Sequence, residues 1–138
     1  MNTLIVYWSG TGNTKAMAEA IAQGVEAAGS RATLFSVNQF GGEFDGYDKI
    51  LLGCPAMGAE VLEEDEFEPF WQASKSKLAS KSVALFGSYG WGSGEWMQNW
   101  ADEAKASGIA IVDEGFICQE NEDDIFEKCF CYGKNILS

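Results

Sequence analysis

Short apolar runs alternate with segments of helical periodicity along the chain. Runs typical of strands occur at 3–8, 31–37, 49–53, 82–88 and 109–113, and the last is expected to resume at 116–118. Apolar residues three and four positions apart predict helices at 14–28, 63–78, 95–107 and 123–137. Five strands alternating with four helices favour a doubly wound α/β fold, with a mostly parallel five-stranded sheet covered by helices on both faces.

The proportion of hydrophobic residues agrees with this fold. The chain has 138 residues, of which 46% are hydrophobic. This is enough for one compact domain, expected to span 1–138. No run approaches the roughly 18 apolar residues of a membrane span, and the N-terminal residues carry no basic leader. We therefore expect a cytoplasmic protein that does not enter a membrane.

The charge is strongly acidic. Nine basic and 21 acidic residues give a net charge of -12, which disfavours binding to nucleic acid or anionic membranes and favours docking to basic protein surfaces. The densest acidic run lies between Glu60 and Glu68. It is either a solvated face near a helix N-terminus or a docking patch that also opposes the addition of negative charge to a nearby ligand. Both interpretations can hold together.

The chain contains no histidine, which excludes catalysis by Ser/His/Asp or Cys/His groups and metal sites that use histidine. Its four cysteines include no Cys-x-x-Cys pair, so we expect no metal site. Cys129 falls on the apolar face of the last predicted helix and Cys131 on the polar face. The first is expected to be buried and the second to be an exposed thiol.

The first strand leads directly into a turn rich in hydroxyl groups and glycine. The turn residues able to bind an anion are Ser9, Gly10, Thr11, Gly12, Asn13 and Thr14. Their side chains donate O–H and N–H groups, the glycines let main-chain N–H groups converge, and the following helix points its N-terminus at the same place. This arrangement predicts a phosphate site, although an ordinary βα turn has a similar composition.

Spacing excludes two other phosphate-binding designs. A mononucleotide P-loop needs Gly-Lys-Ser/Thr at its end, but Lys15 follows Thr14. A dinucleotide fingerprint needs glycine where Lys15 stands and an acid at the end of the second strand, which instead ends in Val37-Asn38. The remaining possibility is a loop that holds a terminal phosphate with neutral donors.

Two further loops follow strands at the same predicted edge of the sheet, where doubly wound proteins bind ligands. The irregular segment 55–62 contains Met57 beside a glycine, and the segment 89–94 contains Trp91 among glycines. Met57 and Trp91 are able to cover the two faces of a flat ring. For either residue alone, a side chain that simply packs in its loop is an equally good explanation.

Four stretches together resemble the short-chain flavodoxins of anaerobic bacteria. They are Val6-Tyr-Trp-Ser-Gly-Thr-Gly-Asn-Thr14, Leu52-Gly-Cys-Pro-Ala-Met-Gly58, Glu66-Phe-Glu-Pro-Phe70 and Ala84-Leu-Phe-Gly-Ser-Tyr-Gly-Trp-Gly92. The resemblance implies a sheet of order 2-1-3-4-5, one non-covalently bound FMN, and low-potential one-electron transport between redox enzymes through the semiquinone/hydroquinone couple. It implies no catalytic residues, and an electron carrier of this kind is expected to be a monomer.

The resemblance also implies roles for particular residues. It places the FMN phosphate on residues 9–14, the stacking side chains at Met57 and Trp91, and the acid at the pyrimidine edge at Glu60. The redox-responsive turn falls on Gly58 and Ala59. Further backbone and hydroxyl contacts fall on Pro55, Ala56, Ser88, Tyr89, Gly90 and Gly92. Similar proteins often have a polar residue at the position of Ala59, and the loop 119–123 also departs from the pattern.

Two other functions are compatible with parts of the sequence. A flavin-dependent reductase of the quinone or azo type would need a substrate pocket beyond the bare sheet and its helices. A phosphoryl-binding regulator would need an acidic pocket where Ser9 to Thr14 lie. An electron carrier is the function that agrees best with all three loops.

Overall fold

The computed structural model describes residues 2–58, 60–90 and 92–136. Its strands are β1 (Asn2–Tyr7), β2 (Arg31–Ser36), β3 (Lys49–Gly53), β4 (Ser82–Tyr89), β5 (Ala110–Ile111) and β6 (Phe116–Gln119). Its helices are α1 (Asn13–Ala27), α2 (Phe67–Ser74), α3 (Glu95–Ala106) and α4 (Ile125–Asn135), with a short 3-10 turn at Lys75–Lys77. No helix in these three described ranges is long and apolar enough to span a bilayer.

The strands form one parallel sheet of order β2-β1-β3-β4-β5, which confirms the predicted topology. β1 lies between β2 and β3, with Ile5 opposite Leu34 on one side and Leu51 on the other. β3 continues to β4, with Leu51 opposite Ala84. The carboxyl ends of β1, β3 and β4 therefore lie together at one edge of the sheet.

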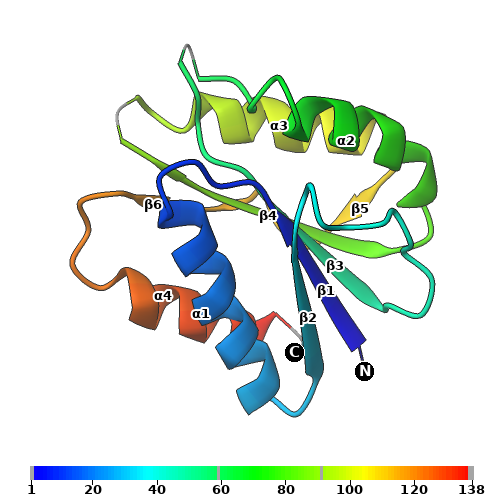
Figure 1. The fold of residues 1–138 in the computed structure, drawn as a ribbon, viewed down its shortest axis with the longest axis horizontal. Coiled ribbons are helices and arrows are strands. Elements are labelled where there is room, and N and C mark those ends of the chain that lie inside the picture. Colours follow the sequence, from blue (N-terminus) through cyan, green and yellow to red (C-terminus); the bar gives the residue numbers. More distant parts are fainter. Residues whose placement is uncertain (1, 59, 91, 137–138) are drawn as a thin grey trace.

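Helices cover both faces of the sheet, with α1 and α4 on one side and α2 and α3 on the other (Figure 1). Alternation along β1 shows how one strand supplies both cores. Leu4 and Val6 belong to the cluster shared with α2 and α3, whereas Ile5 and Tyr7 belong to the cluster shared with α1 and α4. Side chains of a strand alternate between faces, so a continuous apolar run is what a sheet buried on both faces requires.

The fifth strand of the prediction is two short strands that both pair with β4. β5 lies beside Ser82 and Val83, and β6 lies beside residues 86–89. The chain turns between them, where the Gly115 N–H donates to Asp113 Oδ1 at 2.9 Å and Gly115 has a φ of 107°. The expected strand at 109–113 was therefore too long, and its expected resumption at 116 is correct.

Helix α2 begins four residues later than predicted, because a side chain takes the place of its first turn. Glu63 is buried, and its carboxylate accepts hydrogen bonds of 2.8 Å from the N–H groups of Asp65, Glu66 and Phe67. Burial raises the pKa of Glu63, but these three donors outweigh it and the pKa is lowered. The segment before Phe67 is thus a side-chain cap, not a helical turn.

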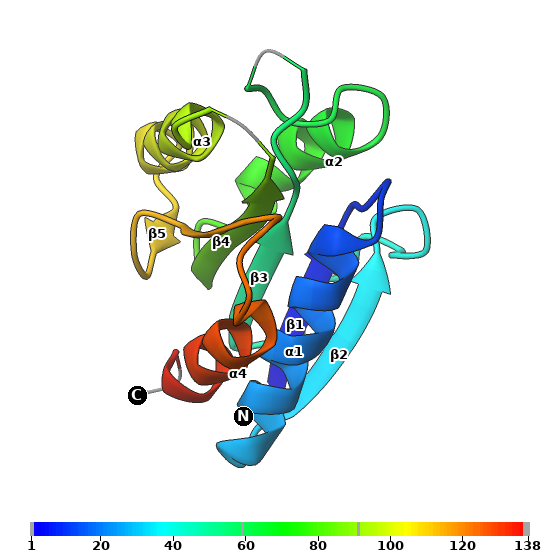
Figure 2. The ribbon, with the colours of Figure 1, turned by 90° about the vertical axis from the view of Figure 1, so that its left-hand side faces the viewer.

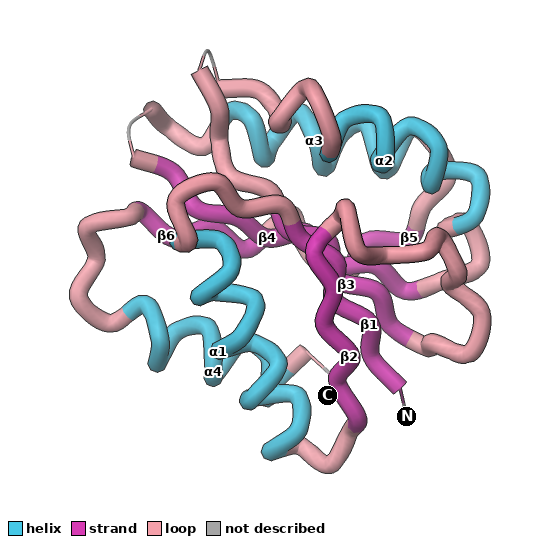
Figure 3. Tube along the Cα trace, viewed as in Figure 1, coloured by secondary structure: helices cyan, strands magenta, loops and turns pink. Residues whose placement is uncertain are grey.

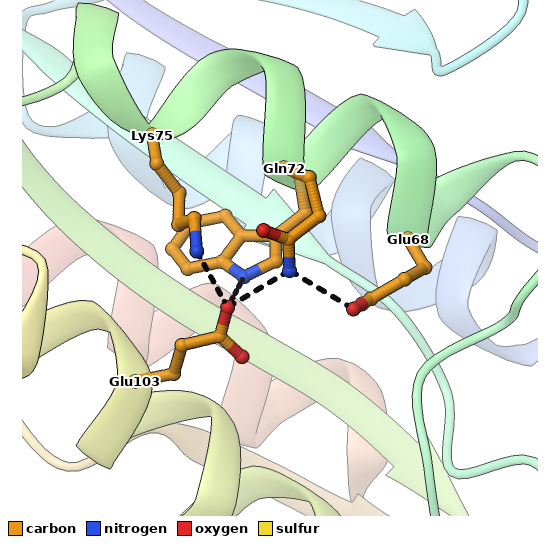
Figure 4. A network of polar contacts seen from close by, with 5 residues as sticks. Glu68, Gln72, Lys75 and Glu103 are labelled. Atoms are coloured by element: carbon orange, nitrogen blue, oxygen red, sulfur yellow. Dashed lines mark hydrogen bonds and ion pairs between the residues drawn. The ribbon is translucent and has the colours of Figure 1, made fainter.

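A polar network joins α2 to α3 (Figure 4). Glu103 on α3 accepts hydrogen bonds at one oxygen from Trp71 Nε1 at 3.0 Å, Gln72 Nε2 at 2.9 Å and Lys75 Nζ at 2.9 Å. Burial raises the pKa of Glu103, but the hydrogen bonds from Lys75, Gln72 and Trp71 outweigh this effect, so the pKa is lowered and the ionised carboxylate is stabilised. The network fixes the distance between the two helices that follow the loops at 54–62 and 90–94.

Helix α4 packs across α1 at a crossing that two glycines allow. A Cβ on Gly24 would lie 2.0 Å from the Phe130 carbonyl oxygen, and one on Gly133 would lie 2.1 Å from that of Ile21. Cys129 is buried and Cys131 exposed, as predicted. The helical period of the sequence also predicts that Phe126 lies on the apolar face with Cys129, but its side chain is 52% exposed, so that prediction was wrong. Leu137 lies outside the described residues.

Candidate functional site

The loops after β1, β3 and β4 leave the sheet at the same edge, opposite the end that carries the N-terminus (Figure 2; loops pink in Figure 3). Main-chain hydrogen bonds join them. The Trp8 N–H donates to the Gly53 carbonyl at 2.9 Å, and the Ala56 N–H donates to the Ser88 carbonyl at 3.0 Å. The three loops that the sequence singled out thus form one surface.

The loop after β1 has the form of an anion cradle. Gly12 has a φ of 97° at the N-terminus of α1, and its N–H donates to Ser9 Oγ at 3.0 Å. Asn13 Nδ2 donates to Thr11 Oγ1 at 3.1 Å. Gly10, Thr11 and Gly12 are exposed. The loop therefore offers hydroxyl, amide and main-chain donors together with the positive end of a 15-residue helix.

Thr14 differs from the other cradle residues. It is 1% exposed, and its hydroxyl lies 2.9 Å from Ser88 Oγ, 74 residues away in the chain. One of these hydroxyls donates to the other, and the accepting hydroxyl keeps its own proton available for another acceptor. The pair consequently joins the start of α1 to the end of β4 and supplies one free O–H rather than two.

Trp8 is part of this site, although no role was predicted for it from the sequence. Its ring lies where a Cβ on Gly10 would approach within 2.9 Å, and its Nε1 donates to Glu66 Oε1 at 2.8 Å. Trp8 also lines a cavity of about 600 Å³ together with the cradle, Lys15 and residues 36–39. The only signal in the sequence was an aromatic residue immediately before the cradle.

The loop after β3 contains a tight turn between Met57 and Val61. The Met57 N–H donates to the Val61 carbonyl at 2.9 Å, and the Val61 N–H donates to the Met57 carbonyl at 3.1 Å. Gly58 has a φ of 46° and Glu60 a φ of 56°, so both adopt the left-handed region. Gly58 is exposed with open space around its Cα. Ala59 lies outside the described residues.

Glu60 joins this turn to the loop after β4. Its Oε1 accepts hydrogen bonds from the N–H groups of Gly94 at 3.0 Å and Glu95 at 3.2 Å, at the start of α3. A Cβ on Gly92 would lie 2.5 Å from the same oxygen, so Gly92 leaves the space that the carboxylate occupies. Glu60 therefore caps α3 in this structure, a contact that the sequence analysis missed.

The remaining residues of the site lie behind or beside these loops. Pro55 and Ser88 are buried and Gly90 is exposed. The Tyr89 ring packs against Trp96 with centroids 5.6 Å apart. Trp91 lies outside the described residues. Cys54 is buried beneath the loop after β3, and burial raises the pKa of its thiol, which is thereby kept protonated.

Comparison with known proteins agrees with this site. The flavodoxin family profile matches residues 5–133. Curated flavodoxins from Clostridium beijerinckii and Megasphaera elsdenii are 45% and 51% identical to the chain. The first alignment covers 97% of this chain and 98% of the relative, and the second covers 78% and 80%. The solution structure of two-electron reduced Megasphaera elsdenii flavodoxin superposes with a TM-score of 0.86 at 42% identity, covering 97% of each chain.

Flavodoxins bind FMN and transfer electrons; they are not enzymes with substrates of their own. The reductase and regulator alternatives are therefore not favoured. The family match spans most of the chain, and the sheet order and the three loops at its carboxyl edge agree with that match. The chain belongs to the flavodoxin family and is an FMN-binding electron carrier.

Proposed function

We propose that the three converging loops hold one FMN at the carboxyl edge of the sheet, within a single domain. The observation that carries this proposal is the convergence of the three loops, which the hydrogen bond between Thr14 and Ser88 stabilises. The cradle fits a phosphate group, because it offers neutral donors and a helix N-terminus. The phosphate contacts are assigned to Ser9, Gly10, Thr11, Gly12, Asn13 and Thr14.

The ring is assigned to the two loops after β3 and β4. Met57 and Trp91 cover its two faces, and Glu60 reaches its pyrimidine edge. The other contacts are assigned to Pro55, Ala56, Gly58, Ala59, Ser88, Tyr89, Gly90 and Gly92. Glu60 Oε1 accepts hydrogen bonds from the N–H groups at the start of α3. The second oxygen, Oε2, can therefore accept a hydrogen bond from the ring while the cap on α3 is kept.

FMN supplies the one-electron chemistry when it is bound, and the chain sets the conditions for it. Met57 and Trp91 exclude water from the ring. Negative side chains nearby oppose the addition of an electron and thereby lower the potential. Glu60 in the turn after β3 is such a side chain, and Glu66 adds a negative charge beside the phosphate cradle.

The partners are proposed to be redox enzymes that present basic surfaces, and the carrier is proposed to act as a cytoplasmic monomer. Flavodoxins deliver electrons to redox enzymes. The net charge of -12 favours association with a basic surface over an acidic one. The acidic residues between Glu60 and Glu68 lie next to the proposed ring site, where charge attraction would bring a partner close to the flavin.

The phosphate assignment is tested by titrating the FMN-free protein with FMN and with riboflavin. Thr11→Ala should weaken FMN binding by about 1.5 to 3 kcal/mol, the range for a hydrogen bond to a charged group, and should hardly affect riboflavin. Thr11→Ser keeps the hydroxyl and is the matched control, expected to behave like the wild type. Equal affinities of the wild type for FMN and riboflavin would show that the loop is not a phosphate site.

A further inference from the structure

Two of the four cysteines lie in the core between β6 and α4, and neither is among the residues assigned to FMN. Cys118 on β6 is 1% exposed and Cys129 on α4 is 0% exposed. Both side chains belong to the hydrophobic cluster shared with α1, and both are free thiols. A buried thiol alone behaves as a small apolar side chain, so the placement of the two sulfurs relative to each other decides whether they can do more.

A neighbouring aromatic pair fixes how α4 lies over β6. The rings of Phe116 and Tyr132 stack with centroids 4.2 Å apart and an interplanar angle of 13°. Cys118 is two residues after Phe116, so it lies on the same face of the strand. Cys129 is three residues before Tyr132, so it lies on the same face of the helix. Because α4 runs in the opposite direction to β6, these two spacings bring Cys118 and Cys129 together.

The two thiols are in hydrogen-bond contact. The Cys129 S–H donates to the Cys118 sulfur. This hydrogen bond lowers the pKa of the Cys118 thiol against the effect of burial, and the same bond together with burial raises the pKa of the Cys129 thiol. Cys118 is therefore the sulfur that ionises first, with the other sulfur within reach.

Cys54 and Cys131 lack this arrangement. Cys54 is buried, but its sulfur accepts a hydrogen bond from the Glu63 N–H at 3.4 Å, and no hydrogen bond joins it to another sulfur in the described parts of the chain. Cys131 is exposed, and its position two residues after Cys129 places it on a different face of α4. One is a control for burial and the other for closeness in sequence.

We propose that Cys118 and Cys129 are a site of reversible modification, at which hydrogen peroxide converts the two thiols into a disulfide that joins β6 to α4. The Cys118 thiolate attacks one peroxide oxygen, the O–O bond breaks, and a sulfenic acid forms while the other oxygen leaves as water with the thiol proton. The Cys129 sulfur then attacks the Cys118 sulfur, the S–O bond breaks, and a second water leaves. Two electrons pass from the thiols to the peroxide, and none passes to or from the flavin.

The structure offers the peroxide a way toward the pair. A hollow of about 200 Å³ is lined by Ser88, which is opposite Cys118 in the sheet, and by Ile125, which lies one helical turn before Cys129. Peroxide is little larger than water, and a small local opening of α4 would let it reach the sulfurs. The disulfide would then close residues 118–129 into a loop and oppose further opening of α4.

Peptide mapping of the FMN-bound wild type tests the proposal. The folded protein is treated with hydrogen peroxide and unfolded, and its remaining thiols are alkylated before digestion and mass spectrometry. Chymotrypsin cleaves after Phe130 and so separates Cys129 from Cys131. We expect a peptide in which Cys118 is linked to Cys129, which dithiothreitol converts back to free thiols, and we expect Cys54 to be recovered alkylated.

Two controls separate the folded arrangement from closeness in sequence. Cys131→Ser removes only the exposed thiol and should give the same linked peptide. Protein unfolded in urea before the peroxide is added should give mixed pairs that include Cys131.

Hydrogen exchange of the α4 amides is a second readout. Exchange should slow by about tenfold or more in the oxidised protein and return to its original rate after reduction, because the disulfide opposes opening of the helix. Cys118→Ser, treated in the same way, should show no slowing.

Two results would overturn the inference. If peroxide oxidises Cys131 in the folded protein while Cys118 and Cys129 are both recovered alkylated, the pair only fills the core. If Cys131 is linked to either of them in place of the expected disulfide, closeness in sequence determines the pairing and the contact between β6 and α4 does not.

Discussion

Gly58 is the residue whose backbone conformation matters most for the proposed redox function. It has a φ of 46° in a turn closed by the two hydrogen bonds between Met57 and Val61, and nothing lies within 4 Å of its missing Cβ. Conformation alone therefore favours glycine at this position. We propose that the peptide after Gly58 can turn over so that the Gly58 carbonyl accepts a hydrogen bond from N5–H of a flavin that has gained one electron and one proton.

Replacing Gly58 with valine tests this role. A β-branched residue disfavours the left-handed region, so Gly58→Val should hinder the turning of the peptide and lower the potential of the first one-electron step. One net hydrogen bond of about 0.5 to 1.5 kcal/mol corresponds to roughly 20 to 65 mV for a one-electron couple. A stepwise redox titration of the FMN-bound protein measures the potential of this first step.

Gly46→Val is the control for that titration, because Gly46 has a φ of 88° and open space around it but lies on the connection before β3. Gly46→Val should destabilise the turn that contains residue 46 without changing the potential of either one-electron step. If Gly58→Val left the first potential within about 10 mV of the wild type, below the single-bond estimate, the peptide would not be the responsive element.

Residues of the site differ in how far the sequence could place them. The cradle from Ser9 to Asn13 was predictable because its donors are neighbours in the chain. The pairing of Thr14 with Ser88 and the contact of Glu60 with Gly94 join residues 74 and 34 positions apart. Such contacts depend on the packed structure, because periodicity specifies which face of an element is buried but not which loop side chains meet.

Among the elements, α2 shows why helix boundaries were the weaker predictions. Glu63 and the acids after it are compatible with a helical turn, yet the Glu63 carboxylate competes for the same N–H groups. Periodicity does identify the buried face, since Phe67, Trp71 and Ser74, spaced three and four residues apart, are buried. The register of the helix was thus predictable and its first residue was not.

The cap on α2 predicts a pH-dependent contribution to stability. The pKa of Glu63 is lowered in the folded protein, so its contribution is fully present above the unfolded-state pKa of about 4.3 and is lost as the pH falls through the folded-state value. Glu63→Gln should lower the free energy of unfolding by about 1 to 3 kcal/mol at pH 7, because the remaining donors lose a charged acceptor.

Urea unfolding at pH 7 and at pH 3 measures the difference in the free energy of unfolding between Glu63→Gln and the wild type. This difference should be smaller at pH 3. Glu64→Gln is the control, since Glu64 is exposed and forms no hydrogen bond or ion pair among the described residues. A difference that stays constant between the two pH values would mean that the charge of Glu63 does not stabilise α2.

The crossing of α1 and α4 predicts a large effect from a single methyl group. Gly24→Ala would place a Cβ 2.0 Å from the Phe130 carbonyl oxygen, so the helices would have to move apart. We expect a loss of about 1 to 3 kcal/mol in the free energy of unfolding despite the better helix propensity of alanine. Gly41→Ala, with open space and an ordinary φ, is the control and should stay within about 1 kcal/mol.

At the scale of the whole molecule, salt should act differently on the cofactor and on the partner. FMN is a dianion, its phosphate is assigned here to neutral donors, and the protein has a net charge of -12, so added salt screens repulsion and should not weaken FMN binding. Electron transfer to a basic protein such as cytochrome c should slow by about tenfold or more between low and high salt, because screening removes the attraction.

Stopped-flow measurements with the reduced protein check this prediction, and ferricyanide is the control acceptor. Ferricyanide is an anion, so its rate should rise with salt while that of cytochrome c falls. Rates that fall for both acceptors would indicate that salt affects the protein itself instead of its encounter with a charged partner.

The contact between α1 and α4 also bears on how the protein is made. Almost the whole sheet lies between these helices in sequence, yet each covers the other through Gly24 and Gly133. During synthesis α1 leaves the ribosome long before α4 exists, so Ile21 and its apolar neighbours have no covering helix in the nascent chain. Until the ribosome has released α4, the half-made protein presents to the chaperones of the cell a helix face that the finished molecule hides.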